Sequence, residues 1–196
     1  MSAHRLIRPV VTTLAAAIAL LLIAGAASTI VWPRYVASLG PIDLSASCEP
    51  STVVVDRNGR LLRPFTLPDG RWRLPATTHD VDPRYVAMLV AYEDARFYQH
   101  PGVDARALLR AAGQWLMRGR VVSGGSTLTM QVARLIEPRS ERTLTAKARQ
   151  IARALQIERE VGKAGALDRY LTLAPFGGNL EGVRAASLAY FGKEPL

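Results

Sequence analysis

Apolar side chains between residues 82 and 100 recur at the spacing of an α-helix, and an acid falls among them. Asp82 followed by Pro83 is typical of a helix start, with a capping side chain and a first-turn proline. The next residues form an apolar stripe: Val86, Leu89, Val90 and Phe97. Glu93 lies on that stripe, whereas we expect the side chain of Asp94 to turn away from it. The pattern therefore predicts a helix with a carboxylate on its core-facing side.

A segment with short apolar runs precedes this helix. The stretch STVVVDRNGRLLRPF (51–65) has two such runs separated by Asn58-Gly59. Because an Asn-Gly pair between apolar runs is a strong hairpin signal, we expect a β-hairpin here. The following LPDGRWRLP (67–75) predicts a proline-bounded connection.

The rest of the chain reads as helical. One helix is expected to begin at Asp104 and end at Arg118-Gly119, and another to begin after the loop SGGS (123–126), capped by Ser126 or Thr127. A long basic helix is predicted over 140–160, and shorter helices around 164–173 and 180–190. The expected core stripe of the long helix is Leu144, Ala148, Ile151 and Leu155. The fold class is therefore mainly α, with a small β-hairpin arm.

The N-terminal part of the chain predicts a membrane segment. Residues 10–32 carry no charge, and about 20 apolar residues cross a bilayer. Arg5 and Arg8 precede this run, so the N-terminus is expected in the cytoplasm, and Trp32 and Tyr35 suit the far interface. A cleaved signal peptide is the alternative, because AGAAS (24–28) offers small residues for cleavage. Either way, the remainder is expected outside the cytoplasm.

Composition and charge narrow the classes of partner. The chain has 196 residues and a net charge of +9, which favours an anionic partner. An extracytoplasmic location argues against nucleic acid. Cys48 is the single cysteine, so no internal disulfide is possible, and no Cys/His cluster has the spacing of zinc ligands.

Three features are candidates for chemistry. Glu93 must be neutral, paired or functional if it faces a core, and pairing with Arg96 is the structural alternative. The stretch GGSTLTMQ (124–131) offers free backbone N–H groups and hydroxyls at a helix start, which suits an anionic oxygen. The third feature is a set of cations that could equally form a solvated helix face: Arg110, Arg134, Arg142, Lys147, Arg149 and Arg153.

Several of these stretches together resemble a known family. EDARFYQHPGVD (93–104), GGSTLTMQVARL (124–135) and APFGGNLEGVRAASLAYFGK (174–193) occur in the order and spacing of the peptidoglycan glycosyltransferases of family 51. These are the transglycosylase domains of bifunctional penicillin-binding proteins. DGRWRLP (69–75) and ARALQIER (152–159) look most like the 1C type within that family. The resemblance covers about residues 50–196.

The resemblance implies a lysozyme-like helical domain that polymerises lipid II, the undecaprenyl-pyrophosphate-linked disaccharide peptide. The acceptor 4-hydroxyl attacks the anomeric carbon of the donor with inversion, which forms a β-1,4 glycan and releases undecaprenyl pyrophosphate. By the motif match, Glu93 is the catalytic carboxylate that takes the proton of the attacking hydroxyl. The matching substrate-binding positions are Asp94, Arg110, Gly125, Ser126, Thr127, Gln131, Arg134, Arg142, Lys147 and Gln150.

The same resemblance implies a domain organisation and partners. We expect a cytoplasmic tail (1–9), a transmembrane signal anchor (10–32), a linker with the hairpin arm (33–78) and the glycosyltransferase domain (79–196). Expected partners are lipid II, the growing glycan strand, the bacterial inner membrane and other cell-wall synthesis proteins, with no nucleic acid. No cofactor is named by the sequence; a divalent cation could assist at the substrate pyrophosphate, without a dedicated metal site.

The sequence departs from the family pattern in four places. These are Met130 in the second motif, Ala146 and Gln150 in the third, KAGALDRYLT (163–172) with Thr172 in the fourth, and the chain end after YFGKEPL. Gln150 stands where the family has a second acid, which a pyrophosphate leaving group makes less necessary than in an inverting glycosidase. No Ser-x-x-Lys motif occurs and the chain ends soon after the last family motif, so we expect a truncated domain without penicillin-binding activity. Two alternatives remain: a lytic transglycosylase or lysozyme-type hydrolase, and an inactive membrane-anchored fragment that binds lipid II.

Overall fold

The structure is a computed structural model that describes residues 25–26, 29–45, 49–120, 124–138, 141 and 143–196. The chain divides into two compact units, 1–41 and 42–196. In the first unit, residues 29–38 are helical, and the rings of Trp32 and Tyr35 lie 5.8 Å apart. Within the described residues, no helix combines the length and the apolarity needed to cross a membrane. Most of the anchor predicted over 10–32, and Cys48, lie outside the described residues.

The predicted β-hairpin is confirmed. Strands β1 (Val53–Val55) and β2 (Leu61–Pro64) pair antiparallel, with an irregularity between Val54 and Val55. The turn is closed by Asp56, whose carboxylate accepts hydrogen bonds from the backbone N–H groups of Asn58 and Arg60 at 2.8 Å. Gly59 has φ 80°, a left-handed conformation that glycine adopts without steric cost.

The helix predicted from Asp82 is α2 (Pro83–Glu93), and the Asp82 side chain caps it by accepting from Arg84 N. The prediction that the apolar stripe of this helix continues to Phe97, with Asp94 turned away from it, is wrong in two respects. The helix ends at Glu93, so Phe97 lies instead in a short 3-10 helix, η3 (Phe97–Gln99), with its side chain fully buried. Asp94 leaves the helical conformation at φ −158°, which turns its side chain into the core rather than away from it.

The next two helices begin and end close to the predicted positions. Helix α3 (Ala105–Arg118) is capped by Asp104 and ends at Gly119, whose φ of 64° is left-handed. Helix α4 (Leu128–Ile136) is capped by Thr127, which accepts from Met130 N. These local signals were sufficient because a cap depends on a few consecutive residues.

The long basic helix and the shorter helix predicted after it are confirmed as two helical segments. Helix α5 (Leu144–Leu173) begins at the cap Thr143 and is broken at Gly162 (φ 66°, ψ −170°), between the helices predicted over 140–160 and 164–173. The predicted core stripe is wrong: Leu144 is 90% exposed, and the buried apolar residues of its first part are Ala152, Ala154 and Ile157. Helix α4 packs along α5, so the position of α4, and not the periodicity of α5 alone, decides which residues of α5 are buried.

A second small sheet was not foreseen. Strand β3 (Trp72–Arg73), within the predicted proline-bounded connection, pairs parallel with β4 (Leu180–Glu181), just before helix α6 (Val183–Phe191). Arg73 and Glu181 are both buried and form an ion pair, with 2.6 Å between Arg73 Nη2 and Glu181 Oε2. A pairing over this sequence separation leaves no local signal.

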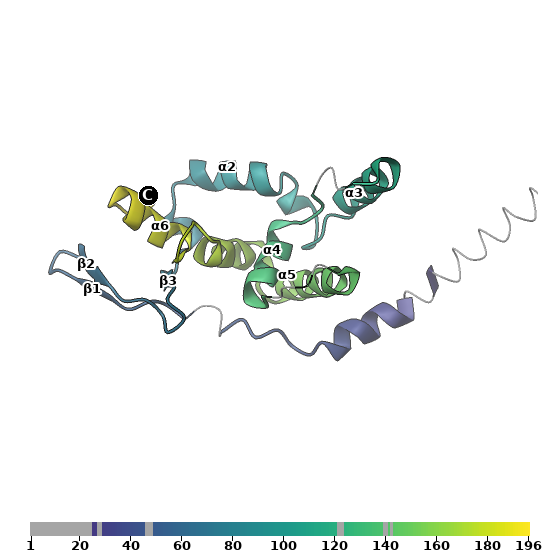
Figure 1. Ribbon diagram of the computed structural model, residues 1–196, viewed down its shortest axis with the longest axis horizontal. Coiled ribbons are helices and arrows are strands. Elements are labelled where there is room, and N and C mark those ends of the chain that lie inside the picture. The colour runs from purple at the N-terminus through teal and green to yellow at the C-terminus, as the bar shows by residue number, and fades with distance from the viewer. Residues whose placement is uncertain (1–24, 27–28, 46–48, 121–123, 139–140, 142) are drawn as a thin grey trace, which may run out of the picture. The chain divides into compact units, whose positions relative to one another are not determined.

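The core of the second unit is built mainly by α4 and α5, with η3 and the start of α6 packed against them (Figure 1). Its fully buried side chains include Phe97, Leu128, Val132, Ile157 and Leu171. The second unit is therefore mainly helical with small sheets, as the sequence predicts. Thr172 bridges this core to Ala76, accepting from its N–H and donating to its carbonyl oxygen, both at 3.1 Å.

Candidate active site

Glu93 ends α2 and points at α4. It is half-buried, and its Oε2 accepts a hydrogen bond of 2.8 Å from Gln131 Nε2 on α4. Arg96, the partner considered as the structural alternative, pairs with Asp104 instead. Glu93 therefore has an amide partner and no ion-pair partner within the described residues.

The residues that hold Glu93 in place form a network that we call the frame: residues 94–104 together with Thr127 and Leu128. Asp94 accepts from the backbone N–H of Leu128 at 3.1 Å and from His100 Nε2 at 3.0 Å. Because a carboxylate only accepts, His100 carries a proton on Nε2 in this bond. The Thr127 hydroxyl donates to the Gly102 carbonyl oxygen at 2.6 Å. The frame thus fastens the end of α2 to the start of α4.

Gly102 is required by the frame. Its φ of +90° is unfavourable for other residues, and a Cβ there would lie 2.7 Å from Glu158 Cγ and 2.8 Å from the Ala154 carbonyl oxygen. Glu158 itself accepts from Thr129 at 2.7 Å and from Lys163 at 2.6 Å. The loop that follows Glu93 is therefore pressed directly against α5.

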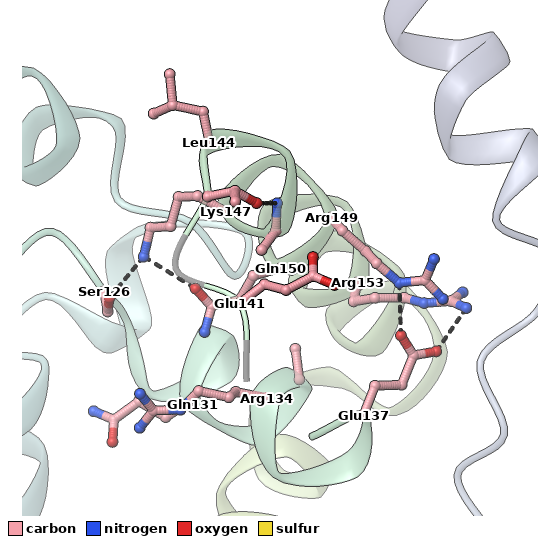
Figure 2. A pocket seen from close by; sticks show the side chains of 13 residues that line it. Ser126, Gln131, Arg134, Glu137, Glu141, Leu144, Lys147, Arg149, Gln150 and Arg153 are labelled. Atoms are coloured by element: carbon pink, nitrogen blue, oxygen red, sulfur yellow. Dashed lines mark hydrogen bonds and ion pairs between the residues drawn. The ribbon is translucent and has the colours of Figure 1, made fainter. Parts of the chain in front are cut away.

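A pocket of ≈ 780 Å³ lies between α4 and α5, and we refer to it as the pocket. Gln131, the partner of Glu93, lines it, which places the carboxylate beside the pocket. Its other polar lining includes Ser126, Arg134, Glu137, Lys147 and Gln150 (Figure 2). The sequence predicted four of these five residues; Glu137 was missed.

Lys147 is held at one end of the pocket by neutral partners. Its Nζ donates to Ser126 Oγ at 2.7 Å and to Gln150 Oε1 at 3.0 Å (Figure 2). Burial, and then the positive charge of Arg134, lower the pKa of Lys147 from its ordinary value. Gln150 in turn donates to the Met130 carbonyl oxygen at 2.8 Å, so its amide works here as a clamp on Lys147.

Two tyrosines near Glu93 were not predicted. Burial, followed by the negative charge of Glu93, raises the pKa of Tyr170 to about 12 and raises that of Tyr85. Both hydroxyls therefore stay protonated at neutral pH. The signal available in the sequence was weak, since both residues also fit an apolar helix face.

The remaining predicted residues lie in different places. Arg110 is exposed on α3 and does not line the pocket, and Arg142 lies outside the described residues. Gly125 fits against Leu108, where an added Cβ would lie 3.1 Å from Leu108 Cδ2. Asp94 and Thr127 are buried in the frame. Among the described residues, no three His, Cys, Asp or Glu side chains form a group that could hold a metal.

Comparison with known proteins identifies the class to which this helical unit belongs. A family model described as Transglycosylase matches residues 58–196, and the chain belongs to that family. Penicillin-binding protein 1C of Escherichia coli strain K12 is 48% identical over 183 residues, which are 93% of this chain and 22% of that protein. Penicillin-binding protein 1A of Pseudomonas aeruginosa is 36% identical over 140 residues, 71% of this chain and 17% of that protein.

A shorter relative also matches. The biosynthetic peptidoglycan transglycosylase of Thiobacillus denitrificans is 36% identical over 105 residues, 54% of this chain and 45% of that protein. The chain thus spans about a fifth of the two penicillin-binding proteins and less than half of this transglycosylase. The predicted family and its 1C-type resemblance are confirmed.

Proposed function

We propose that this chain is a peptidoglycan glycosyltransferase that polymerises lipid II into β-1,4 glycan and releases undecaprenyl pyrophosphate. The observation that carries the proposal is the juxtaposition of Glu93, held by Gln131, with a pocket whose Lys147 and Arg134 have no carboxylate partner in the described chain. A carboxylate base can take the proton of an attacking sugar hydroxyl. Cations beside it can stabilise a diphosphate that leaves from the attacked carbon.

Glu93 acts as the general base in this proposal. Its carboxylate takes the proton of the acceptor 4-hydroxyl as the new bond from that oxygen to the donor anomeric carbon forms on the face opposite the leaving group. The bond from the anomeric carbon to the diphosphate oxygen breaks with its electron pair, which inverts the configuration. The hydrogen bond from Gln131 fixes the carboxylate orientation.

Lys147 and Arg134 stabilise the departing diphosphate. A diphosphate needs cations more than a proton, so a second acid is not required in the way that it is for an inverting glycosidase. Gln150 fits this scheme because it holds Lys147 in position through the bonds of its amide to Lys147 and Met130. Ser126 provides a second fixed contact for the Lys147 ammonium group.

The setting of the reaction is part of the proposal. A lipid-linked donor is presented at a membrane, so we propose a lysozyme-like domain outside the cytoplasm of a bacterium, tethered to the inner membrane by residues 10–32, with residues 33–78 as linker and arm. The growing glycan strand is the second substrate, and other cell-wall synthesis proteins are the expected neighbours. A divalent cation at the diphosphate remains compatible with the scheme, and chelation during the assay tests it.

Polymerisation of labelled lipid II by the detergent-solubilised chain tests the proposal. We expect a glycan product, with no cleavage of finished peptidoglycan added to the same preparation. Cleavage of finished glycan without polymerisation would favour a lytic transglycosylase or hydrolase. Lipid II binding by a folded chain that forms no product would favour an inactive binding fragment.

A further inference from the structure

Glu137 and Glu141 are the two acids among the described residues that line the pocket, and Glu137 is the one bonded to its cations. It follows directly after α4, and each of its carboxylate oxygens is taken by a different arginine of α5. Oε2 accepts from Arg149 Nε at 2.9 Å, and Oε1 lies 2.7 Å from Arg153 Nη2 (Figure 2). The Arg153 side chain is 5% exposed, whereas the side chains of Glu137 and Arg149 are 25% and 27% exposed, so the pairing with Arg149 is open to water in part.

The carboxylate of Glu137 is ionised at neutral pH. Burial by itself raises the pKa of Glu137, but the hydrogen bonds from Arg149 and Arg153 outweigh burial and hold the pKa below its ordinary value. The two guanidinium groups therefore face a permanent carboxylate. These charge-assisted bonds take one nitrogen of each arginine, Arg149 Nε and Arg153 Nη2, and offset part of the charge that would otherwise attract a phosphate.

The other end of the pocket has the opposite character. Lys147 is bonded only to the neutral side chains of Ser126 and Gln150, and Arg134 has no ion pair within the described chain. In Figure 2, Lys147 points toward Ser126, away from the cluster of Glu137, Arg149 and Arg153. The pocket thus has one end where no acid is bonded to the cations within the described residues, and one end where Glu137 offsets one of the two arginine charges.

We propose that Glu137 is a specificity-determining residue that, by occupying Arg149 and Arg153, confines a diphosphate to the Lys147 end of the pocket and so fixes the orientation of the lipid-linked substrate. This inference rests on the proposed function, because it assigns the place of that substrate's diphosphate. Glu137 itself touches no reacting atom; it acts through the two arginines.

Titration of inorganic pyrophosphate into the full chain, followed by calorimetry, tests the inference. We expect Glu137→Gln to tighten pyrophosphate binding about fivefold, the effect of freeing one partly exposed ion pair. Arg149→Met alone should change the affinity less than about twofold, because that arginine is occupied, whereas Arg149→Met in the Glu137→Gln chain should remove the gain. Equal affinity of Glu137→Gln and the native chain, or no binding by the native chain, would overturn the inference.

Glu141→Gln is the matched control. Glu141 lines the same pocket and is exposed, and no ion pair involves it within the described residues. Its replacement removes the same charge without releasing an arginine, so we expect less than half of the gain. A gain equal to that of Glu137→Gln would mean that total pocket charge, rather than release of the arginines, decides the affinity, and would contradict the inference.

A second comparison covers the case in which Glu137→Gln does not fold, since it leaves Arg153 buried without its acid. In the otherwise native chain, Lys147→Met should weaken pyrophosphate binding about tenfold while Arg149→Met does not. Equal losses would overturn the inference. Polymerisation of lipid II is measured separately: its absence with this binding pattern intact contradicts the proposed function, and its presence without the pattern contradicts the role of Glu137.

Discussion

Two regions flank Glu93 and use their polar groups in opposite ways. In the frame, each charged or hydroxyl side chain that we described is matched inside the protein: Asp94 with His100 and Leu128 N, Arg96 with Asp104, and Thr127 with Gly102. At the Lys147 end of the pocket, by contrast, the ammonium group has neutral partners alone among the described residues. The polar groups of the frame bond to one another and fix the position of Glu93. The cations at the Lys147 end of the pocket remain available to an anionic ligand. Substitutions should therefore separate into those that cost folding and those that cost binding.

The largest effect on folding is expected at Phe97, which is fully buried where η3 meets α4 and α5. Phe97→Ala should lower the free energy of unfolding by about 3–5 kcal/mol, the usual result of removing a core aromatic ring. The neighbouring Tyr98 is 66% exposed, and Tyr98→Ala should cost less than about 1 kcal/mol. Denaturant unfolding checks both, and similar losses would show that the loop is not anchored by Phe97.

Asp94→Ala should cost about 2–3 kcal/mol, because it leaves the buried N–H of Leu128 and the buried His100 without their acceptor. Asp94→Asn keeps one acceptor oxygen and should cost less than half as much. Denaturant unfolding of both variants measures these two losses of stability. Native stability in Asp94→Ala would contradict the description of the frame.

Acid should weaken the frame through Asp104. The hydrogen bond from Arg96 lowers the pKa of Asp104 to about 2 from an ordinary value of 3.8. Because the folded-state pKa lies below the unfolded one, this group stabilises the protein fully above about pH 4 and loses that contribution as pH falls toward 2. We expect Asp104→Asn to reduce the loss of stability across this range by about 1–2 kcal/mol. An unchanged pH dependence would contradict the assignment.

Lys147→Met should affect binding and not folding. The methionine keeps the apolar stem but removes the charge, so lipid II affinity should fall about tenfold with the free energy of unfolding nearly unchanged. Arg159→Met is the matched control, since Arg159 is an exposed cation of the same helix outside the pocket. Equal loss of affinity in the two variants would mean that the overall positive charge, rather than Lys147, attracts the substrate.

Sequence reasoning reached the frame and the pocket by different routes. The caps Asp82, Asp104 and Thr127, and the Asn58-Gly59 turn, were readable because each depends on a few consecutive residues. The side of α5 that faces the core could not be predicted from the sequence, because the packing of α4 against α5 decides which small residues of α5 are buried. The pairing of β3 with β4 likewise depends on distant contacts, whereas the break in α5 at Gly162 falls between the two helices that the sequence predicts.

The candidate site shows the same division. Glu93, Ser126, Gln131 and Lys147 were identified by motif, and the structure brings them to one place. Glu137 was missed, because an acid after an amphipathic helix is usually a solvated cap. Its relation to Arg149 and Arg153 appears only once α4 and α5 are packed together.

The most direct test of the account is to compare lipid II polymerisation and lipid II binding in Glu93→Gln and in Glu160→Gln, an exposed glutamate of α5 outside the pocket. The account predicts that Glu93→Gln loses turnover by about 10²–10⁴-fold, the usual contribution of a general base, while it binds lipid II within about twofold of the native chain. Glu160→Gln should keep both properties. Polymerisation by Glu93→Gln at the native rate would contradict the central claim that Glu93 is the base of a glycosyltransferase.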